Sequence, residues 1–334
     1  MKLLEQTVVI DGCAFGEGGF PGYTQRMAAA SVDAVFFTIP DSSRGFRAAA
    51  SSIGHIYGRV DQQSDKLRIA RVPNDIERAQ AEGGTAIVLA FQDPAPIENR
   101  IEFLRVFYEL GVRVVQLTYN KANYMGTGCA EPEDRGLTDF GRQVIREMNR
   151  LGMLVDLSHC SGLTTLEAID LSEHPVVLSH ANVRPISDNP RNHTDDEFQQ
   201  LAQKGGVVGL TPWGPPCWKR QKDEPPSLDD YLDHVEYVVN LVGVDHIGFG
   251  TDNTLDGAAD EEGTKAQSKL YPSVVGEYDR RVGTAPEVRY ARGFAGYQEL
   301  DNVVRGLEDR GFGEEHVKQF LGGNFMRVLR AVWK

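Results

Sequence analysis

Two histidines of the sequence stand in nearly identical surroundings and could bind one metal ion together. His159 and His180 each follow a Leu-Ser pair at the end of an apolar run that is typical of a buried strand. Neutral imidazole is the commonest metal ligand in proteins, and neighbouring strands would bring the two rings to the same ion. A single histidine at a strand end is more often a hydrogen-bonded core residue, whereas this matched pair predicts a metal site.

Other polar and aromatic residues also follow predicted strands and would face the same site. In a parallel barrel the carboxyl ends of the strands meet at one mouth, where active sites are built. The residues in these positions are Asp11, Gln92, Tyr119, Trp213 and Asp252. Arg191 lies in the loop after His180 and is expected to reach the same mouth. The other six histidines are interpreted as surface or capping residues: His55, His174, His193, His234, His246 and His316.

Eight short runs of β-branched and aromatic residues would position these side chains. They cover residues 8–10, 34–37, 86–89, 114–117, 153–157, 176–178, 207–210 and 246–249. Segments of helical periodicity separate the runs, which is typical of repeated βα units and a parallel sheet. Eight strands close a TIM-type barrel, so the sequence predicts the α/β class and a (β/α)8 barrel.

Four other segments allow a more detailed prediction. Residues 138–151 and 194–204 predict helices that begin after Thr138 and Thr194. A closing helix is expected over residues 314–332, interrupted at Gly322-Gly323 and packed on the outside of the barrel. Residues 253–292 follow the last strand, where barrel enzymes place substrate lids. This segment is expected to cover the mouth or a neighbouring subunit, with a disordered surface excursion as the alternative.

The composition indicates a soluble globular protein. The 334 residues are 41% hydrophobic and 25% charged, and no linker divides them, which predicts one domain over residues 1–334. The net charge of −13 argues against nucleic acid and an anionic membrane as partners. Four scattered cysteines without a CxxC pair are typical of reduced thiols. Because neither a signal peptide nor a spanning apolar run is recognised, a cytoplasmic location is expected.

The chain resembles the membrane dipeptidase (renal dipeptidase) family of zinc metallopeptidases. The resemblance is carried by residues 136–210, by HIGFGTDNTLDG near position 250 and by the ending LGGNFMRVLRAVWK. The blocks DLSH, SHAN, PRN and GTD occur in that order and are highly specific. The resemblance implies an amidohydrolase-like (β/α)8 barrel that spans nearly the whole chain.

The resemblance also implies roles for four residues of this sequence. His159 and His180 match the two histidines that hold one zinc of the family's metal pair. Arg191 matches the arginine that receives the carboxylate of the substrate. Asp252 matches the aspartate that handles the proton of the catalytic water.

Four positions depart from the family pattern. The family begins with DGHND, whose His and Asp hold the first zinc, and these two residues are Cys13 and Phe15 here. Gln92 replaces the bridging glutamate and Tyr119 replaces a substrate-side histidine. Phenylalanine cannot coordinate a metal, and a neutral amide is a poor substitute for a bridging carboxylate. The QLTYN and GTGCAEPED runs resemble a divergent bacterial branch of the family that lacks the HxD motif.

These departures predict at most one tightly held metal, namely one Zn²⁺ per chain. The predicted ligands are His159 and His180, with Asp252 as third ligand or general base and Gln92 or Cys13 completing the shell. For Cys13, a role as a buried structural cysteine is favoured over one as a ligand. Tyr119 is expected to donate a hydrogen bond to a developing oxyanion.

The predicted function is metal-dependent hydrolysis of a dipeptide or a related small carboxylated amide. The substrate would bind through Arg191, Tyr119 and Trp213, and a homodimer is expected because members of the family are commonly dimers. The alternative is a non-peptidase enzyme or a binding protein for a small N-methylated amino acid derivative, with a degenerate metal site. In that case Trp213, Tyr119 and Phe15 would contact a quaternary ammonium through their rings. A lyase or isomerase lacks a distinctive base in this sequence.

Overall fold

The computed structural model describes residues 2–16, 20–22, 27, 31–40, 42–255 and 261–334. Within them eight parallel strands form a ring in chain order, closed by the pairing of Asp11 with Phe249. This confirms the predicted (β/α)8 barrel. The ring consists of β1 (Ile10–Phe15), β2 (Ala34–Thr38), β4 (Thr85–Phe91), β5 (Val112–Gln116), β6 (Leu154–Asp156), β7 (Val177–Ala181), β8 (Val207–Leu210) and β9 (Ile247–Phe249).

Each strand of the ring overlaps one of the predicted apolar runs. Strand β4 is buried along its whole length, as expected of a parallel strand covered on both faces. Two short strands were not predicted. Strand β3 (Leu67–Ile69) pairs with the first residues of β4, and β10 (Asn253–Thr254) pairs with the end of β1. Their two or three residues carry too little pattern to distinguish them from a loop.

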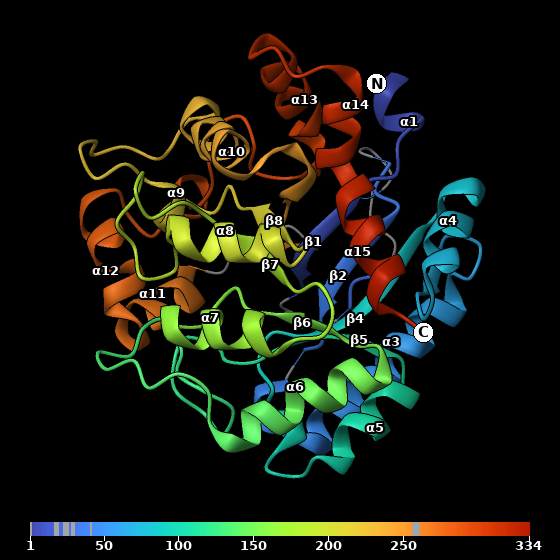
Figure 1. Cartoon of the computed structure of the whole chain (residues 1–334). Helices are drawn as coiled ribbons and strands as arrows, with labels where there is room; N and C mark the ends of the chain where they lie inside the picture. The colour runs from blue at the N-terminus through green and yellow to red at the C-terminus, as the bar shows by residue number, and fades with distance from the viewer. Residues whose placement is uncertain (1, 17–19, 23–26, 28–30, 41, 256–260) are drawn as a thin grey trace.

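Helices surround the ring of strands and connect successive strands (Figure 1). The predicted helices are confirmed as α6 (Asp139–Leu151) and α8 (Asp195–Gln203). Thr138 Oγ1 accepts a hydrogen bond from the Gly141 amide (2.9 Å), and Thr194 forms a capping box with Glu197. The other helices of the described residues are α1 (Lys2–Glu5), α3 (Phe46–Gln62), α4 (Pro73–Glu82), α5 (Glu102–Glu109), α7 (Gly162–Leu171), α9 (Gly214–Cys217), α10 (Leu228–Val242), α11 (Glu261–Leu270), α12 (Pro272–Arg281), α13 (Leu300–Asp309), α14 (Glu314–Lys318) and α15 (Asn324–Val332).

Short helical turns complete the connections. The 3-10 turns are η1 (Ser42–Arg44), η2 (Ala95–Ile97), η3 (Val244–His246), η4 (Pro286–Val288) and η5 (Tyr297–Glu299). A π-helical turn, η6 (Gln319–Gly323), separates α14 from α15, at the place where the paired glycines predicted an interruption. Glycine is required there because a Cβ on Gly322 would lie 2.4 Å from the Val8 carbonyl oxygen.

The prediction that the C-terminal helix packs on the outside of the barrel is incomplete. Helix α15 covers the amino-terminal end of the ring, and its apolar residues join the cluster formed by the first residues of the strands. Phe325 is fully buried and packs edge-on against Phe36 of β2, with ring centroids 5.3 Å apart. The amino-terminal end is therefore closed by α15, and the carboxyl end is the one that remains accessible.

The segment after the last strand contributes to that carboxyl end. Helices α11 and α12 contact each other, and residues of both line the cavity described below. This agrees with the prediction that the segment covers the mouth, although residues 256–260 lie outside the described part of the chain. In the described chain no helix combines the length and apolar character needed to span a membrane.

Candidate metal centre and substrate cavity

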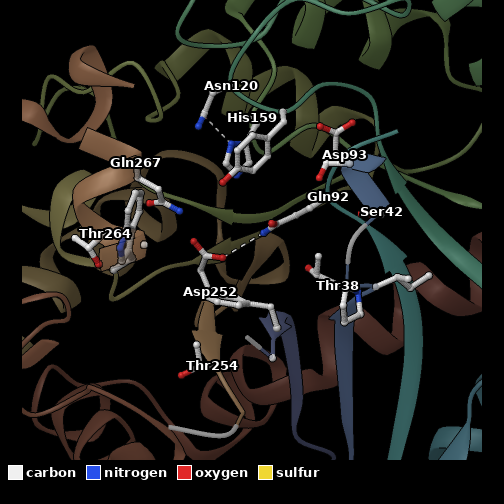
Figure 2. Close-up of a pocket in the computed structure, with 18 of the residues that line it drawn as sticks. Thr38, Ser42, Gln92, Asp93, Asn120, His159, Asp252, Thr254, Thr264 and Gln267 are labelled. Carbon is white, nitrogen blue, oxygen red and sulfur yellow. Dashed lines mark hydrogen bonds between the residues drawn. The ribbon is translucent and has the colours of Figure 1, made fainter. Parts of the chain in front are cut away.

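A cavity of about 900 Å³ opens at the carboxyl ends of the strands. Six of the residues predicted from strand ends and loops line it: Gln92, Tyr119, His159, Arg191, Trp213 and Asp252. Figure 2 shows His159, Gln92 and Asp252 around one central space, each coming from a different strand end. Asp11 does not face this space. It lies within β1, fully buried, where it accepts hydrogen bonds from Thr251 and Tyr297.

The two predicted metal-binding histidines lie together, with their Nε2 atoms 2.9 Å apart. The hydrogen of His159 lies on Nδ1, because that atom contacts the acceptor Asn120 Oδ1 (2.8 Å). The hydrogen of His180 also lies on Nδ1, because its partner Ser179 Oγ (2.8 Å) uses its own hydrogen for Asp156 Oδ2 (2.5 Å). Each histidine therefore directs the lone pair of Nε2 toward the other.

This arrangement calls for a cation. Burial, reinforced by the nearby Arg191 guanidinium, lowers the pKa of both imidazoles well below the usual value, so neither ring carries an additional proton at neutral pH. Two lone pairs that face each other at 2.9 Å repel each other unless a positive charge lies close to both. A metal ion satisfies both nitrogens.

The hydrogen bonds around Gln92 lead to the same conclusion. Its amide nitrogen lies 3.0 Å from Cys13 Sγ, 3.2 Å from Asp252 Oδ1 and 3.3 Å from His180 Nε2. A primary amide has two N–H groups, which cannot satisfy three acceptors. Rotating the amide would instead present its oxygen, a possible metal ligand. Both orientations leave metal-binding atoms around one point without enough donors.

Asp252 occupies a strained position between β9 and β10. Its backbone has a φ of +50°, which is uncommon for a residue other than glycine. Two hydrogen bonds to the Asp252 backbone stabilise this conformation. The Asp252 amide donates to the Cys13 carbonyl (2.8 Å), and the Tyr290 hydroxyl donates to the Asp252 carbonyl (2.7 Å). Burial raises the pKa of the Asp252 carboxyl, opposed by Arg191 and by the hydrogen bond from Gln92. Such strain is typical of functional sites.

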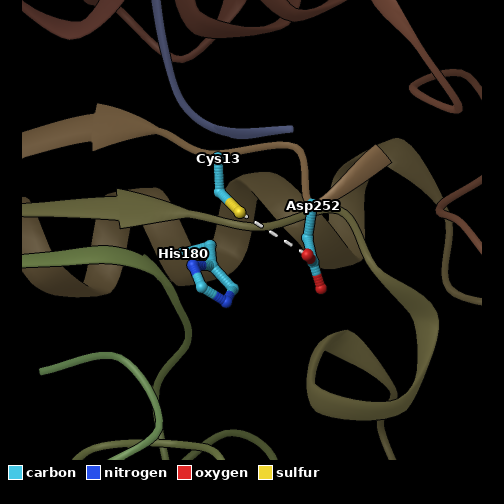
Figure 3. Close-up of side chains that lie close together, drawn as sticks. All are labelled: Cys13, His180 and Asp252. Carbon is cyan, nitrogen blue, oxygen red and sulfur yellow. Dashed lines mark hydrogen bonds between the residues drawn. The ribbon is translucent and has the colours of Figure 1, made fainter. Parts of the chain in front are cut away.

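Cys13 also faces the metal-binding atoms. Its thiol, with Nε2 of His180 and a carboxylate oxygen of Asp252, forms a group whose atoms all lie within 4.8 Å of one another (Figure 3). The sequence left two roles open for Cys13, with a buried structural cysteine favoured over a ligand, and this position is the one that the ligand role requires. Burial, together with the Asp252 carboxylate, raises the pKa of the Cys13 thiol well above the usual value in the absence of a metal.

The donor set fits one zinc ion. Zinc binds imidazole nitrogen, carboxylate oxygen and thiolate sulfur, and all three donor types are present here. His159 and His180 provide nitrogen, Asp252 provides oxygen, and Gln92 lies at the centre of the group. A second zinc site of the family kind does not fit, because Phe15 lines the cavity without a coordinating atom.

Tyr119 and Trp213 line the cavity through their rings. Tyr119 stacks on His159 with ring centroids 4.4 Å apart, and its hydroxyl makes no hydrogen bond with any described residue. The Arg289 guanidinium lies over the Trp213 ring, 5.7 Å from its centroid. The Tyr119 hydroxyl is therefore available to a ligand, while one face of each ring already has a partner.

Arg191 is a buried cation without a carboxylate partner in the described chain. Only 1% of its surface is exposed, yet it lines the cavity. Its Nη1 and Nη2 atoms donate to the carbonyls of Ser158 and His180, and Nε has no partner. Arginine has five N–H groups, so three of them, including the buried Nε–H, have no acceptor among the described residues.

Several residues that support the site were not predicted from the sequence. Asp156 accepts hydrogen bonds from the hydroxyls of Ser158 and Ser179 and thereby orients the backbone around both histidines. The signal was present in the Leu-Ser-His repeat, because the two serines occupy matched positions one residue before each histidine. Asn120, which fixes the tautomer of His159, follows Tyr119 and had no comparable signal.

Two histidines that were interpreted as surface or capping residues are buried. His193 contacts Glu197 of α8 (2.8 Å), and both are almost fully buried. His193 belongs to the loop between β7 and α8 (residues 182–194), here called the Arg191 loop. His234 accepts a hydrogen bond from the Val183 amide (3.2 Å) and lies against the Cys217 carbonyl. Both stabilise the loop after β7, whose length the sequence did not reveal.

Comparisons with known proteins show which family the chain is similar to. The family model described as membrane dipeptidase (peptidase family M19) matches residues 23–291, a range that begins after β1 with its Cys13 and Phe15. Dipeptidase tcpJ from Claviceps purpurea is 32% identical over 276 residues, which cover 82% of this chain and 57% of that protein. The chain thus spans little more than half the length of this relative.

Solved structures share the fold along the whole chain. An amidohydrolase from Pseudomonas aeruginosa has a TM-score of 0.85 and 32% identity, with coverage of 99% of this chain and 98% of that chain. A metallo peptidase from Rhodobacter sphaeroides, liganded with a phosphinate mimic of the dipeptide L-Ala-D-Ala, has a TM-score of 0.78 at 19% identity and covers 98% of this chain and 100% of its own. The family match over most of the chain confirms the resemblance of the DLSH, SHAN, PRN and GTD blocks: the chain belongs to the membrane dipeptidase family.

Proposed function

We propose that the protein is a metal-dependent hydrolase of dipeptides or related small carboxylated amides. The proposed metal centre holds one zinc ion per chain between His159, His180 and Asp252, next to Gln92. The observation that carries this proposal is the pair of imidazoles whose Nε2 lone pairs face each other at 2.9 Å, one of which, His159, lines the cavity.

When bound, zinc lowers the pKa of a coordinated water to about 7 and polarises a carbonyl group. The protein supplies the proton acceptor. Asp252 uses Oδ1 for Gln92 and Cys13, whereas Oδ2 has no hydrogen bond with a described residue and is free to take up a proton. The Tyr119 hydroxyl, next to His159, can donate to a carbonyl oxygen that gains negative charge.

Two charged groups in the cavity support a substrate with both a carboxylate and an amine. Arg191 lines the cavity and has N–H groups without an acceptor among the described residues, which supports pairing with a carboxylate. Asp93 lines the same cavity, and no cation of the described chain forms an ion pair with it. A dipeptide carries the two complementary charges. The phosphinate mimic of L-Ala-D-Ala bound to the Rhodobacter sphaeroides protein makes dipeptides of this size the first substrates to test.

The direct test is hydrolysis by protein loaded with one equivalent of zinc. L,L- and L,D-dipeptides would be offered to wild type, to chelator-treated wild type and to His180→Ala. We expect turnover only by the zinc-loaded wild type, with about one zinc per chain by elemental analysis. Hydrolysis that persists after zinc removal would contradict the proposal. Two tightly bound zinc ions would contradict the single-metal centre.

The second candidate is an enzyme or binding protein for a small N-methylated amino acid derivative. The aromatic residues of the cavity, Phe15, Tyr119 and Trp213, favour it because such rings bind quaternary ammonium groups. His159 already covers one face of the Tyr119 ring, and Arg289 covers one face of the Trp213 ring. Less ring surface therefore remains for a cation. Zinc-loaded protein that turns over no dipeptide but binds an N-methylated amino acid in calorimetry would favour this candidate.

We also propose that the protein is a cytoplasmic homodimer with no nucleic acid or membrane partner. All four cysteines are free thiols, which supports a reducing compartment. Light scattering on the purified chain tests the dimer: a mass near 37 kDa rather than about twice that value would contradict it.

A further inference from the structure

We propose that Cys13 is a thiolate ligand of the metal beside His159, His180 and Asp252, so that the centre is a mixed sulfur, nitrogen and oxygen site that selects zinc or a similar borderline cation over Mg²⁺ and Mn²⁺. This inference rests on the proposed metal-dependent function. It adds a ligand at a position where the family pattern has histidine, and it specifies the chemical class of the metal.

The three atoms come from three separate parts of the barrel. Cys13 belongs to β1, His180 to β7, and Asp252 to the connection between β9 and β10. Figure 3 shows the three side chains close together. Cys13 Sγ lies 3.6 Å from Asp252 Oδ1, and the amide nitrogen of Gln92 lies within 3.3 Å of all three donors. The point where this amide sits is therefore surrounded by sulfur, nitrogen and oxygen.

The backbone of β1 holds the thiol in this position. The pairing of β1 with β2 shifts register between Asp11 and Ala14, which is a local irregularity around Cys13. The Cys13 amide donates to Asp11 Oδ1 (3.1 Å), and the Cys13 carbonyl accepts from the Asp252 amide (2.8 Å). Cys13 and Asp252 are thus fixed to each other through the backbone as well as through their side chains.

The surroundings of Cys13 differ from those of a packing cysteine. Its sulfur contacts the polar groups of Thr38, Gln92 and Asp252, although only 3% of the residue is exposed. Cys217, in contrast, is fully buried in α9 and makes no such contact with metal-binding side chains of the described chain. A buried thiol among polar metal-binding atoms has a chemical use that packing does not require.

Thiolate ligation explains how a buried thiol can lose its proton. In the metal-free protein burial and the neighbouring carboxylates disfavour a thiolate, whereas a coordinated divalent cation stabilises it and the proton is released to solvent. Thiolate is a soft ligand that favours zinc, while carboxylate and water suit magnesium and manganese. Replacing the family's histidine by cysteine therefore keeps a zinc ligand and shifts selectivity away from hard cations.

Cobalt(II) provides a readout that does not depend on activity. The full chain would be stripped with chelator and titrated with Co²⁺. We expect visible d–d bands from the bound ion and an intense sulfur-to-cobalt charge-transfer band in the near ultraviolet. Cys13→Ser should lose the charge-transfer band but keep d–d bands, since His159, His180 and Asp252 remain. Cys217→Ser is the matched control and should keep both.

Metal competition gives a second measurement. Cys13→Ser should lower zinc affinity at least ten- to hundredfold, because losing even a residue that only hydrogen-bonds to a ligand costs that much. The affinity for Mn²⁺ should fall much less. Wild type that binds Co²⁺ with d–d bands but without a charge-transfer band would overturn the role of Cys13 and leave the metal-dependent function intact. Wild type that binds neither Co²⁺ nor Zn²⁺ would overturn both proposals. Thermal unfolding of each variant verifies that it is folded.

Discussion

At the scale of single residues, Arg191 is the residue that would connect the proposed metal centre to a substrate carboxylate. The guanidinium is held by the carbonyls of Ser158 and His180, which follow or belong to the strands carrying the metal-binding histidines. Its position is therefore determined by the same two strand ends. A substrate carboxylate that pairs with Arg191 would be placed at a fixed distance from the metal centre, which is the kind of positioning that catalysis requires.

Arg191→Lys should weaken substrate binding while leaving the metal content unchanged. Lysine keeps the charge but cannot contact two strand-end carbonyls and a carboxylate with a planar fork of donors. We expect a loss of about 1.5–3 kcal/mol, or roughly ten- to a hundredfold in kcat/KM. Steady-state kinetics and elemental analysis of the same preparation measure both quantities. Dipeptide turnover that is unaffected by the substitution would contradict the carboxylate role.

Asp33 provides a test of pH-dependent stability outside the site. Burial raises the pKa of its carboxyl to about 7, opposed by the hydrogen bond that it accepts from the Val9 amide (2.7 Å). The pKa of Asp33 is higher in the folded than in the unfolded protein. The protonated Asp33 carboxyl therefore contributes fully to stability below pH ~4, and this contribution is lost as the pH rises through about 7. Asp33→Asn keeps an acceptor and removes the charge.

We therefore expect Asp33→Asn to be more stable than wild type at pH 8, by on the order of 1–3 kcal/mol, and similar to it near pH 4.5. Urea unfolding at both pH values measures the difference. A difference in unfolding free energy that is the same at both pH values would show that ionisation of Asp33 is not its cause.

Which site residues could be predicted depended on how local their signal was. His159, His180 and Asp252 stand at strand ends within short specific blocks, so both their chemistry and their convergence were predictable. For Cys13 the sequence could not decide between a ligand and a structural cysteine, because the direction of its side chain depends on a register shift in β1 that the apolar pattern does not encode. Asp93 was missed because a carboxylate in a loop has no local feature that relates it to a cavity.

At the scale of elements, the strands and capped helices were predictable for a physical reason. The apolar runs and the threonine caps act within a few residues, so they can be read from adjacent positions. The contact of α15 with the strand ends depends on Phe325 meeting Phe36, nearly three hundred positions earlier in the chain. Such pairings arise from closure of the barrel and have no counterpart in local periodicity.

Helices α11 and α12 form one wall of the cavity, and Asn189 connects them to the Arg191 loop. The Asn189 amide donates to the Val274 carbonyl of α12 (2.8 Å), and its oxygen accepts from the Arg191 amide (2.9 Å). In Figure 2, Thr264 and Gln267 of α11 lie on the opposite side of the cavity from Gln92. A ligand that contacts both sides would hold these helices in place.

Asn189→Ala should therefore accelerate proteolytic cleavage between residues 261 and 281 several-fold, because the link between α12 and the Arg191 loop is lost. A substrate analogue should slow that cleavage in wild type. Limited proteolysis followed by mass spectrometry locates the cuts, and Gln200→Ala on α8 serves as the matched control. Rapid cleavage of wild type that no ligand alters would indicate that this segment does not act as a lid.

At the scale of the whole molecule, α15 connects the end of the chain to its beginning. Phe325 lies so close to two glycines of the ring that a Cβ on Gly248 would be 2.6 Å from its ring and a Cβ on Gly12 would be 2.9 Å from it. Gly12 belongs to β1 and Gly248 to β9, the two strands whose pairing closes the barrel. Packing of Phe325 thus stabilises the closure itself, which supports the proposal of one domain over residues 1–334.

Phe325→Ala tests this connection. Deleting a fully buried phenylalanine should cost about 3–5 kcal/mol, and Phe325→Leu should cost less because more of the cavity stays filled. If residues 1–334 form one cooperative unit, both variants should lower the midpoint of a single unfolding transition that far-ultraviolet circular dichroism and aromatic fluorescence report alike. Zinc content should persist in the folded variants, since α15 lies at the end of the barrel opposite to the metal-binding side chains. Two separate transitions, of which only one shifts, would instead indicate that the C-terminal helix belongs to an independent unit.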